Sequence, residues 1–475
     1  MWRLLSLLTA LVLTSPVNAQ FGETMQAIEA LVDEAMPTSS APGLAYAVVE
    51  RGTVQASARG EMLLGSGRAV TADTPFQLGS ISKSFTAMAV MQLVEAGEVS
   101  LDAGISTYLE EFNGQAGAAI TVRELLSHTS GYSTLQGNQS HTDQTGGSDE
   151  LAARVNRLAE LVPAAQRGQR WWYSNANYLI LGRLVEVVSG ATFADYIESE
   201  ILEPAGMNSS FVADGEVHET IATGHPPWFT GRRPVADRRT SRVMAPAGGV
   251  IASAADVARY LAIMTNGQDD LISAESKALM LQPANVASPF YGLGWFIDVE
   301  NGDAYHTGLS PGVETIAALS LSEGRGVVVL VNASSGMGFG LTADLLSGIP
   351  AIALDDPYVS VGSQLSAKLF FVMLMSLPVF FVAGIVGAWL LRAGLRAKSG
   401  VSGHFSLWFP LLTTGTMSWA FLSLVPNLFS VPLNTLSLYQ PDMVILLIAS
   451  SVTGLALAVF RLGVFYLGRN EQIQA

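Results

Sequence analysis

Three long apolar runs near the C-terminus constrain the fold of this chain more than any other feature. They span residues 369–391, 405–429 and 443–465, and no ionisable side chain lies near the middle of any of them. A run of about 20 apolar residues is long enough to cross a bilayer as a helix. The alternative, a set of buried core helices, fits segments of this length and composition poorly. We therefore predict three transmembrane helices that anchor the protein to a membrane.

The basic residues beside these runs predict the orientation. The connection after the first run contains Arg392, Arg396 and Lys398, whereas the next connection, residues 430–442, contains no basic residue. Lys and Arg are in excess in cytoplasmic loops. We therefore expect the first connection and the C-terminus in the cytoplasm, and residues 20–355 on the periplasmic, extracytoplasmic side, joined to the spans by a linker, 356–368. The bundle is interpreted as an anchor, and contact with a lipophilic substrate is left open as a second role.

The N-terminus supports the same topology. Arg3 precedes an apolar run over residues 4–13, and Val17, Asn18 and Ala19 end in small residues. This pattern is typical of a secretory signal peptide, here residues 1–19, cleaved before Gln20. An uncleaved anchor is the alternative, which the short apolar run disfavours.

Charge and composition exclude several classes of function. The chain has a mean hydropathy of +0.36. Its net charge is −15, and from Lys368 onward six basic and two acidic residues give +4, which leaves −19 for the rest. An acidic exported domain repels nucleic acid. The chain has no cysteine, which excludes thiol chemistry, and its six histidines show no metal-ligand spacing, so neither metal nor cofactor is predicted.

Residues 20–355 combine strand and helix patterns. Residues 43–50 and 53–59 alternate around an Arg51-Gly52 turn, as in a hairpin. Strand patterns return near the end of the domain, at residues 291–300, 304–307, 314–321 and 325–332. Helical patterns cover residues 23–36, 80–97, 120–131, most of 149–201, and 254–264, with a turn at 244–251 and a polar loop at 138–148. We predict an α/β (α+β) fold in which one antiparallel sheet is assembled from both ends of the domain and backed by a helical lobe.

A serine and a lysine lie one helical turn apart in Gly79-Ser80-Ile81-Ser82-Lys83. Residues three apart share a helix face, so the Lys83 amine can reach the Ser80 hydroxyl. A buried lysine with a lowered pKa can take the proton of a serine nucleophile. S-x-x-K also occurs by chance on surface helices, so the motif alone does not establish catalysis.

Two further motifs supply matching chemistry. Tyr173 precedes Asn175 by two residues in an aromatic stretch. A tyrosine beside a lysine can shuttle protons, since the cation lowers its pKa, and an asparagine can hold an amide. The alternative is that this stretch is a packed aromatic turn with no catalytic role. His306-Thr307-Gly308-Leu309 is expected on an edge strand facing the cleft, where backbone N–H groups can stabilise an oxyanion.

One motif is rejected. Residues 308–312 match G-x-S-x-G, the nucleophile elbow of α/β-hydrolases, which needs a helix after the serine. Strand-like alternation follows instead.

The three motifs, in this order, resemble the serine β-lactamase-like family of class C β-lactamases, DD-peptidases and esterases, of the peptidase S12 type. Residues 125–131, 246–249 and 291–295 are also similar to that family, and the similarity extends over residues 27–332.

The resemblance implies a β-lactamase/transpeptidase-like fold and a serine hydrolase. Ser80 would carry the acyl group, Lys83 and Tyr173 would share acid and base work, and Asn175 would orient the substrate amide. His306 would bind substrate or relay protons, Thr307 and Gly308 would complete the substrate-binding strand, and backbone N–H groups of Ser80 and Leu309 would form the oxyanion hole. His128 would be structural.

One departure bears on the substrate. Class C β-lactamases have lysine where this chain has His306, and a histidine is largely neutral at pH 7. The resemblance therefore implies an amide or ester hydrolase, closest to a carboxypeptidase-like peptidase, with a small molecule or peptide as substrate. Three spans after such a domain also resemble the colibactin-maturation type of D-amino peptidase. A non-catalytic receptor for a β-lactam or peptidoglycan fragment is the alternative from another class. The sequence leaves the oligomeric state open.

Overall fold

The computed structural model describes residues 16–142 and 150–474. Most of the predicted signal peptide, residues 1–15, lies outside the described residues. The first helix, α1 (Pro16–Ser39), runs through the predicted cleavage point before Gln20. The signal peptide therefore stays a prediction.

One antiparallel sheet forms the centre of the domain. Within the described residues it has six strands in the order β2-β1-β11-β10-β9-β8. Their bounds are β1 (Gly43–Glu50), β2 (Thr53–Gly60), β8 (Phe296–Ile297), β9 (Ala304–Ser310), β10 (Val313–Ser320) and β11 (Arg325–Val331). β1 pairs with β11 along its length, with Ala47 opposite Val328. The prediction of an antiparallel sheet assembled from both ends of the domain is confirmed.

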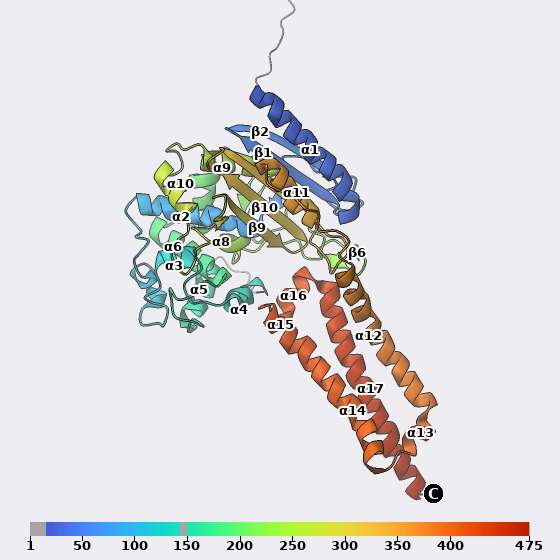
Figure 1. Cartoon of the computed structure of the whole chain (residues 1–475). Coiled ribbons are helices and arrows are strands. Elements are labelled where there is room, and N and C mark those ends of the chain that lie inside the picture. Colours follow the sequence, from blue (N-terminus) through green and yellow to red (C-terminus); the bar gives the residue numbers. More distant parts are fainter. Residues whose placement is uncertain (1–15, 143–149, 475) are drawn as a thin grey trace, which may run out of the picture.

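Helices cover both faces of this sheet (Figure 1). Alternate residues of β1 explain why: Tyr46 and Val48 pack with α1 and α11 (Ala343–Leu354), whereas Ala47 and Val49 belong to the core shared with α9 (Ala254–Thr265). A strand buried on both faces is apolar along its whole length. This two-sided burial fixes the sheet between its helical layers.

The helical lobe lies on the α9 side of the sheet and is built from the middle of the chain. Its helices and short turns are α2 (Ser82–Glu95), η2 (Ile105–Thr107), η3 (Glu110–Phe112), α3 (Val122–Leu126), α4 (Thr134–Asn138), η4 (Gln139–Thr142), α5 (Glu150–Glu160), α6 (Asn175–Ser189), α7 (Phe193–Ile197), η5 (Glu198–Leu202), α8 (Ala245–Gly248) and α10 (Ala274–Met280). The described chain also forms small sheets from β3 (Phe76–Gln77), β7 (Val250–Ala252) and β4 (Phe211–Val212), and from β5 (Pro227–Trp228) and β6 (Gly231–Arg232). A capping box formed by Thr121 and Glu124 starts α3.

Three local predictions are wrong in part. The strand expected at residues 291–300 is reduced to β8, because Gly294 adopts a φ of +85° and turns the chain. The turn expected at 244–251 contains the short helix α8 and then β7. The loop expected at 138–148 begins with the end of α4 and the turn η4, and residues 143–149 lie outside the described part.

The C-terminal residues form a helical bundle that projects from the domain (Figure 1). Its elements are α12 (Leu365–Leu390), α13 (Arg392–Arg396), α14 (Gly400–Trp419), the π-helical turn η6 (Ala420–Leu424), α15 (Val425–Leu428), α16 (Leu433–Tyr439) and α17 (Pro441–Gln474). In the described residues, two helices are long and apolar enough to cross a membrane, with a third span only if the pair bent by 74° at residues 429–432 counts as one. The predicted count of three depends on that bent pair.

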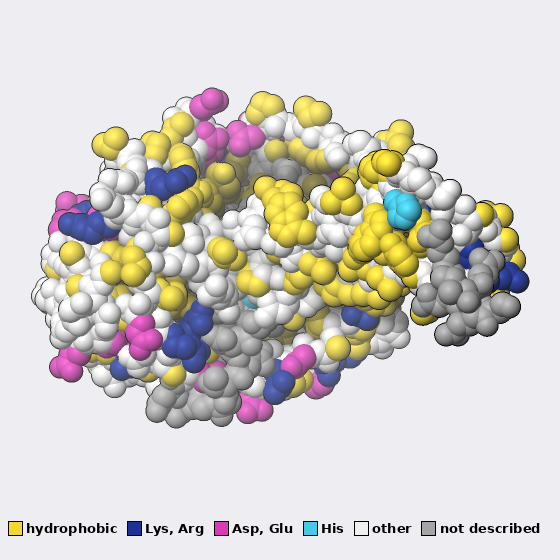
Figure 2. Space-filling model, turned by 90° about the horizontal axis from the view of Figure 1, so that it is seen from below, with side chains coloured by type: hydrophobic (Ala, Val, Ile, Leu, Met, Phe, Trp, Pro, Cys, Tyr) yellow, Lys and Arg dark blue, Asp and Glu magenta, His cyan; other side chains and the backbone are white. Residues whose placement is uncertain are grey.

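Hydrophobic side chains gather over the projecting helices, whereas acidic side chains lie over the larger part of the molecule (Figure 2). Many large apolar side chains of the bundle are exposed, among them Val379 at 70 % and Leu390 at 71 %. Exposed apolar surface of this extent on a helix suits lipid rather than water.

Candidate active site

Ser80 lies on a tight turn between β3 and α2. Residues Gly79–Ile81 form a single 3-10 turn, and α2 begins at Ser82. The turn is pressed against β9: a Cβ atom on Gly79, whose φ is +56°, would lie 2.5 Å from the backbone nitrogen of Leu309. Glycine at this position therefore lets the Ser80 turn approach the strand that carries Leu309.

Lys83 lies in the first turn of α2, three residues after Ser80, and is fully buried. Its Nζ is 3.1 Å from Ser80 Oγ, 2.9 Å from Asn175 Oδ1 and 2.7 Å from the carbonyl oxygen of Ala247. Burial lowers the pKa of the Lys83 amine well below its ordinary value. Burial therefore favours the neutral form of the amine.

The partners of the Lys83 amine fix the direction of its lone pair. A neutral amine has two N–H bonds and one lone pair, and both Asn175 Oδ1 and the Ala247 carbonyl can only accept. The two N–H bonds point at these oxygens, which leaves the lone pair to accept the hydrogen of Ser80 Oγ. This is the arrangement of a general base on a serine nucleophile.

Tyr173 closes the other side of Ser80. Its hydroxyl is within hydrogen-bonding reach of the Ser80 side chain, and Lys83 Nζ lies 4.9 Å from the centre of its ring. Desolvation by burial raises the pKa of Tyr173 and outweighs the opposing effect of its hydrogen bond with Ser80. The expectation that a neighbouring cation lowers the pKa of Tyr173 is wrong, because the phenol is fully buried and its desolvation raises that pKa. Tyr173 is a protonated phenol in the resting site.

Asn175 begins α6 and is nearly buried. Its Oδ1 accepts from Lys83, so its Nδ2 is the donor that faces Asn138 Oδ1 at 3.3 Å and His141 Nε2 at 3.0 Å. The amide is therefore held at both ends, and its contact with Lys83 has a defined orientation.

His306 lies on β9 beneath the aromatic residues of the site. Its Nδ1 donates to the Thr307 carbonyl at 2.7 Å, so its Nε2 accepts from the Tyr291 hydroxyl at 3.0 Å. Burial lowers the pKa of His306 to about 3. The ring is neutral with both nitrogens occupied by protein groups, and it supplies no positive charge for a substrate carboxylate.

The remainder of β9 faces the Ser80 turn. A Cβ atom on Gly308 would lie 2.0 Å from the Leu78 carbonyl oxygen, so only glycine allows this approach. The side chains of Thr307 and Leu309 are exposed, and Leu309 lines the pocket. β8 pairs with Tyr305 and Ala304 only, so the strand from His306 onward is a sheet edge among the described residues, as predicted.

His128 supports the site from behind. It adopts a φ of +60°, its Nδ1 accepts from the backbone N–H of Ser174 at 3.2 Å, and its ring lies 4.4 Å from that of Tyr173. Burial lowers its pKa well below the ordinary value. These contacts hold the turn that carries Tyr173, and they agree with the structural role expected from the sequence.

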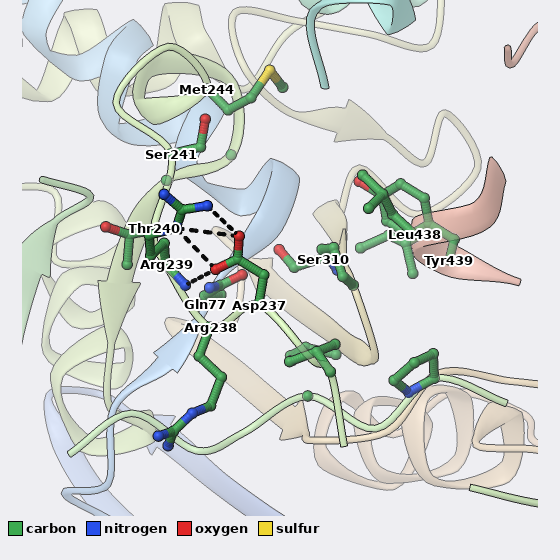
Figure 3. Close-up of a pocket in the computed structure, with 18 of the residues that line it drawn as sticks. Gln77, Asp237, Arg238, Arg239, Thr240, Ser241, Met244, Ser310, Leu438 and Tyr439 are labelled. Carbon is green, nitrogen blue, oxygen red and sulfur yellow. Dashed lines mark hydrogen bonds and ion pairs between the residues drawn. The ribbon is translucent and has the colours of Figure 1, made fainter. Parts of the chain in front are cut away.

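A cavity of about 490 Å³ opens beside Ser80 and Asn175. In Figure 3, Leu438 and Tyr439 project from α16 on the side opposite the chain from Asp237 to Met244. The sequence did not indicate Asn138, His141, Tyr439 or the Ala247 carbonyl as parts of the site. Nothing in their spacing distinguishes them from ordinary loop and helix residues.

The sequence of the domain matches one family model. The model described as Beta-lactamase covers residues 28–347. The chain belongs to the beta-lactamase family.

Relatives of this beta-lactamase family protein include penicillin-binding proteins. Penicillin-binding protein 4 of Amycolatopsis lactamdurans is 32 % identical over 326 residues, which are 64 % of this chain and 84 % of that protein. Putative penicillin-binding protein PbpX of Bacillus subtilis is 31 % identical over 54 % of this chain and 61 % of its own length. Protein flp of Staphylococcus aureus is 24 % identical over 66 % of this chain and 64 % of its own length. The chain thus spans less than two thirds of two of these relatives.

Solved structures show the same fold. The octameric penicillin-binding protein homologue from Pyrococcus abyssi has a TM-score of 0.61 at 27 % identity, over 70 % of this chain and 78 % of that chain. A class C beta-lactamase has a TM-score of 0.58 at 20 % identity, over 71 % of this chain and 97 % of that chain. The β-lactamase/transpeptidase-like fold expected from the sequence is confirmed.

The G-x-S-x-G match has no place in the chemistry of this beta-lactamase family member. Ser310 ends β9, and the next element is the strand β10 rather than a helix. The expected rejection of a nucleophile elbow is confirmed.

Proposed function

We propose that this beta-lactamase family protein is a membrane-anchored serine hydrolase that acts through an acyl-enzyme on amide or ester substrates. The observation that carries the proposal is the position of Lys83 Nζ, 3.1 Å from Ser80 Oγ and held there by the Asn175 Oδ1 and Ala247 carbonyl oxygens. A serine so activated at a tight turn is a nucleophile for a carbonyl carbon.

Each residue of the site has its own role in the reaction. Ser80 Oγ attacks the substrate carbonyl while its proton passes to Lys83 Nζ. The backbone N–H groups of Ser80 and Leu309 stabilise the oxyanion. The Tyr173 phenol gives its proton to the leaving amine or alcohol and is reprotonated from Lys83. Water then attacks the ester on Ser80, its proton passes to Lys83, and Ser80 Oγ regains a proton as the acid is released.

The neutral state of His306 affects which substrates the site can bind. A substrate carboxylate would find no cation at that position, which favours peptidase or esterase activity over a dedicated β-lactamase. A D-amino peptidase of the colibactin-maturation type is the second candidate. It is favoured by the apolar residues of α16 in the pocket, Leu438 among them.

The location follows from the bundle and the charges beside it. We place the catalytic domain on the periplasmic side of the cytoplasmic membrane, since the basic residues Arg392, Arg396 and Lys398 lie at the far end of α12 from the domain.

Covalent labelling tests the proposal. The full-length protein in detergent, treated with a fluorophosphonate or penicillin probe, should be labelled, and Ser80→Ala should abolish the label. Ser310→Ala, which removes the hydroxyl of the rejected motif, should still be labelled. Equal labelling of Ser80→Ala would overturn the proposal.

Turnover separates the enzyme from a receptor. Acyl-D-amino acid amides, short-chain esters and nitrocefin should be compared as substrates of the same preparation. Tight binding of these compounds without turnover of any of them would favour the non-catalytic receptor.

A further inference from the structure

The outer end of the helical bundle forms part of the active-site wall. We call residues 430–441, which connect α15 to α17 and include α16, the membrane-proximal segment. Four of its residues line the cavity beside Ser80 and Asn175: Ser437, Leu438, Tyr439 and Pro441. Leu438 and Tyr439 reach the cavity from α16 (Figure 3). The catalytic pocket is therefore completed by residues that belong to the bundle.

Both hydrogens of the Asn175 amide are directed to residues tied to this segment. On one route, Asn175 Nδ2 donates to Asn138 Oδ1 at 3.3 Å, and Asn138 Nδ2 donates to the Ser430 carbonyl at 2.9 Å. On the other, Asn175 Nδ2 lies 3.0 Å from His141 Nε2, and His141 Nδ1 lies 3.1 Å from the Tyr439 hydroxyl. Thr435 Oγ1 adds a hydrogen bond to the Asn138 carbonyl at 3.2 Å.

The tautomer of His141 follows from its neighbours. Asn175 Nδ2 can only donate, so His141 Nε2 accepts and its hydrogen is on Nδ1. Nδ1–H then donates to the Tyr439 oxygen, and the two rings meet edge to face with centres 5.7 Å apart. The Tyr439 hydroxyl thus accepts from, and stabilises, the tautomer that can accept from Asn175.

We propose that the membrane-proximal segment positions the catalytic base, with Tyr439 and His141 as positioning residues that hold the Asn175 amide against Lys83. This inference rests on the proposed function of Ser80 and Lys83. Asn175 Oδ1 is one of the two acceptors that orient the Lys83 amine. An Asn175 amide free to rotate releases one N–H of Lys83 and turns the lone pair away from Ser80.

The rate of acylation then depends on how the helical bundle packs against the catalytic domain. His141 and Tyr439 are 298 residues apart in sequence. Their contact forms only when α16 lies over η4, so loss of that docking loosens Asn175 even though Ser80, Lys83 and Tyr173 stay in place.

Acylation of the full-length protein by a short-chain ester probe, followed as alcohol release in a single turnover, tests the inference. Tyr439→Phe removes the hydrogen bond between His141 Nδ1 and the Tyr439 hydroxyl. This change should lower the maximal acylation rate about 3-fold to 10-fold. His141→Leu removes the acceptor itself and should lower that rate about 10-fold to 100-fold. His141→Gln restores an acceptor facing Asn175 and should recover the rate to within about 3-fold of the original. The apparent probe affinity should change little, because the chemical step is affected rather than binding.

Tyr466→Phe is the matched control, since Tyr466 is a half-exposed tyrosine of α17 in the same bundle. Its acylation rate should equal that of the original protein. Acylation by Tyr439→Phe and His141→Leu at the rate of Tyr466→Phe would overturn the inference, as would a slow His141→Gln with the same Tm as the original protein. A chain that is never labelled at Ser80 refutes the proposed function instead, so the two failures are distinguishable.

Discussion

Replacing Gly308 by alanine should slow acylation by moving β9 away from the Ser80 turn. The added Cβ would lie 2.0 Å from the Leu78 carbonyl oxygen and 2.1 Å from Thr315 Oγ1, whereas ordinary contacts begin at 3.4 Å. One backbone therefore has to retreat by up to about 1.4 Å. Leu78 immediately precedes the Ser80 turn, and Leu309 follows Gly308, so the retreat separates the N–H groups of Ser80 and Leu309, which form the proposed oxyanion hole.

The expected loss is about 100-fold in kcat/KM, because a misplacement of about 1 Å costs that much in a reaction that depends on alignment. The assay is kcat/KM of the full-length protein for a short-chain ester, together with its Tm. Gly22→Ala is the control, since a Cβ at Gly22 meets nothing within 4 Å. Removing the Thr315 side chain in a Gly308→Ala/Thr315→Ala double variant leaves the Leu78 clash and should not restore the rate. An unchanged acylation rate in folded Gly308→Ala would refute the reasoning.

Two further predictions concern pH. Because burial depresses the pKa of Lys83, acylation should fall about one decade per pH unit as the pH drops through the pKa of Lys83 in the folded protein. Lys83→Met should lower the rate about 100-fold to 10,000-fold and remove this acid limb from the pH profile; a limb that survives in the variant would contradict Lys83 as the base. The second prediction concerns stability. His306 is neutral in the fold with a pKa of about 3, so the unfolded chain binds the extra proton below about pH 6.5. The free energy of unfolding should fall by about 1.4 kcal/mol per pH unit from His306 as the pH drops from about 6.5 toward 3. Denaturant unfolding at pH 7 and pH 5 should show a smaller difference for His306→Gln than for the original protein, and equal differences would show that His306 is charged in the fold.

Several elements of the fold and of the site could be predicted from local patterns in the sequence. The three-residue spacing of Ser80 and Lys83 places both on one turn in any helix, and the β1–β2 hairpin needs only alternation and the Arg51-Gly52 turn. The apolar runs at residues 369–391 and 443–465 predict helices by length and composition alone. These features depend on neighbours within a few residues, which is why they can be seen in a single sequence.

Contacts between distant segments decided the chemistry of the site. The protonation states of Lys83, Tyr173 and His306 follow from burial, and burial exists only once the lobe and the sheet close over these groups. For that reason the expectation of a tyrosinate was wrong while the choice of Tyr173 as a neighbour of Ser80 was not.

The sequence by itself determined the helical turn that joins Ser80 to Lys83, the strands at both ends of the domain and the apolar bundle, because each depends on residues close together in the chain. Only the tertiary structure decided which oxygens orient the Lys83 amine and that α16 closes the pocket. Ala247 lies 164 residues from Lys83, and Tyr439 lies 298 residues from His141. No spacing rule links such residues, since packing of the whole chain brings them together.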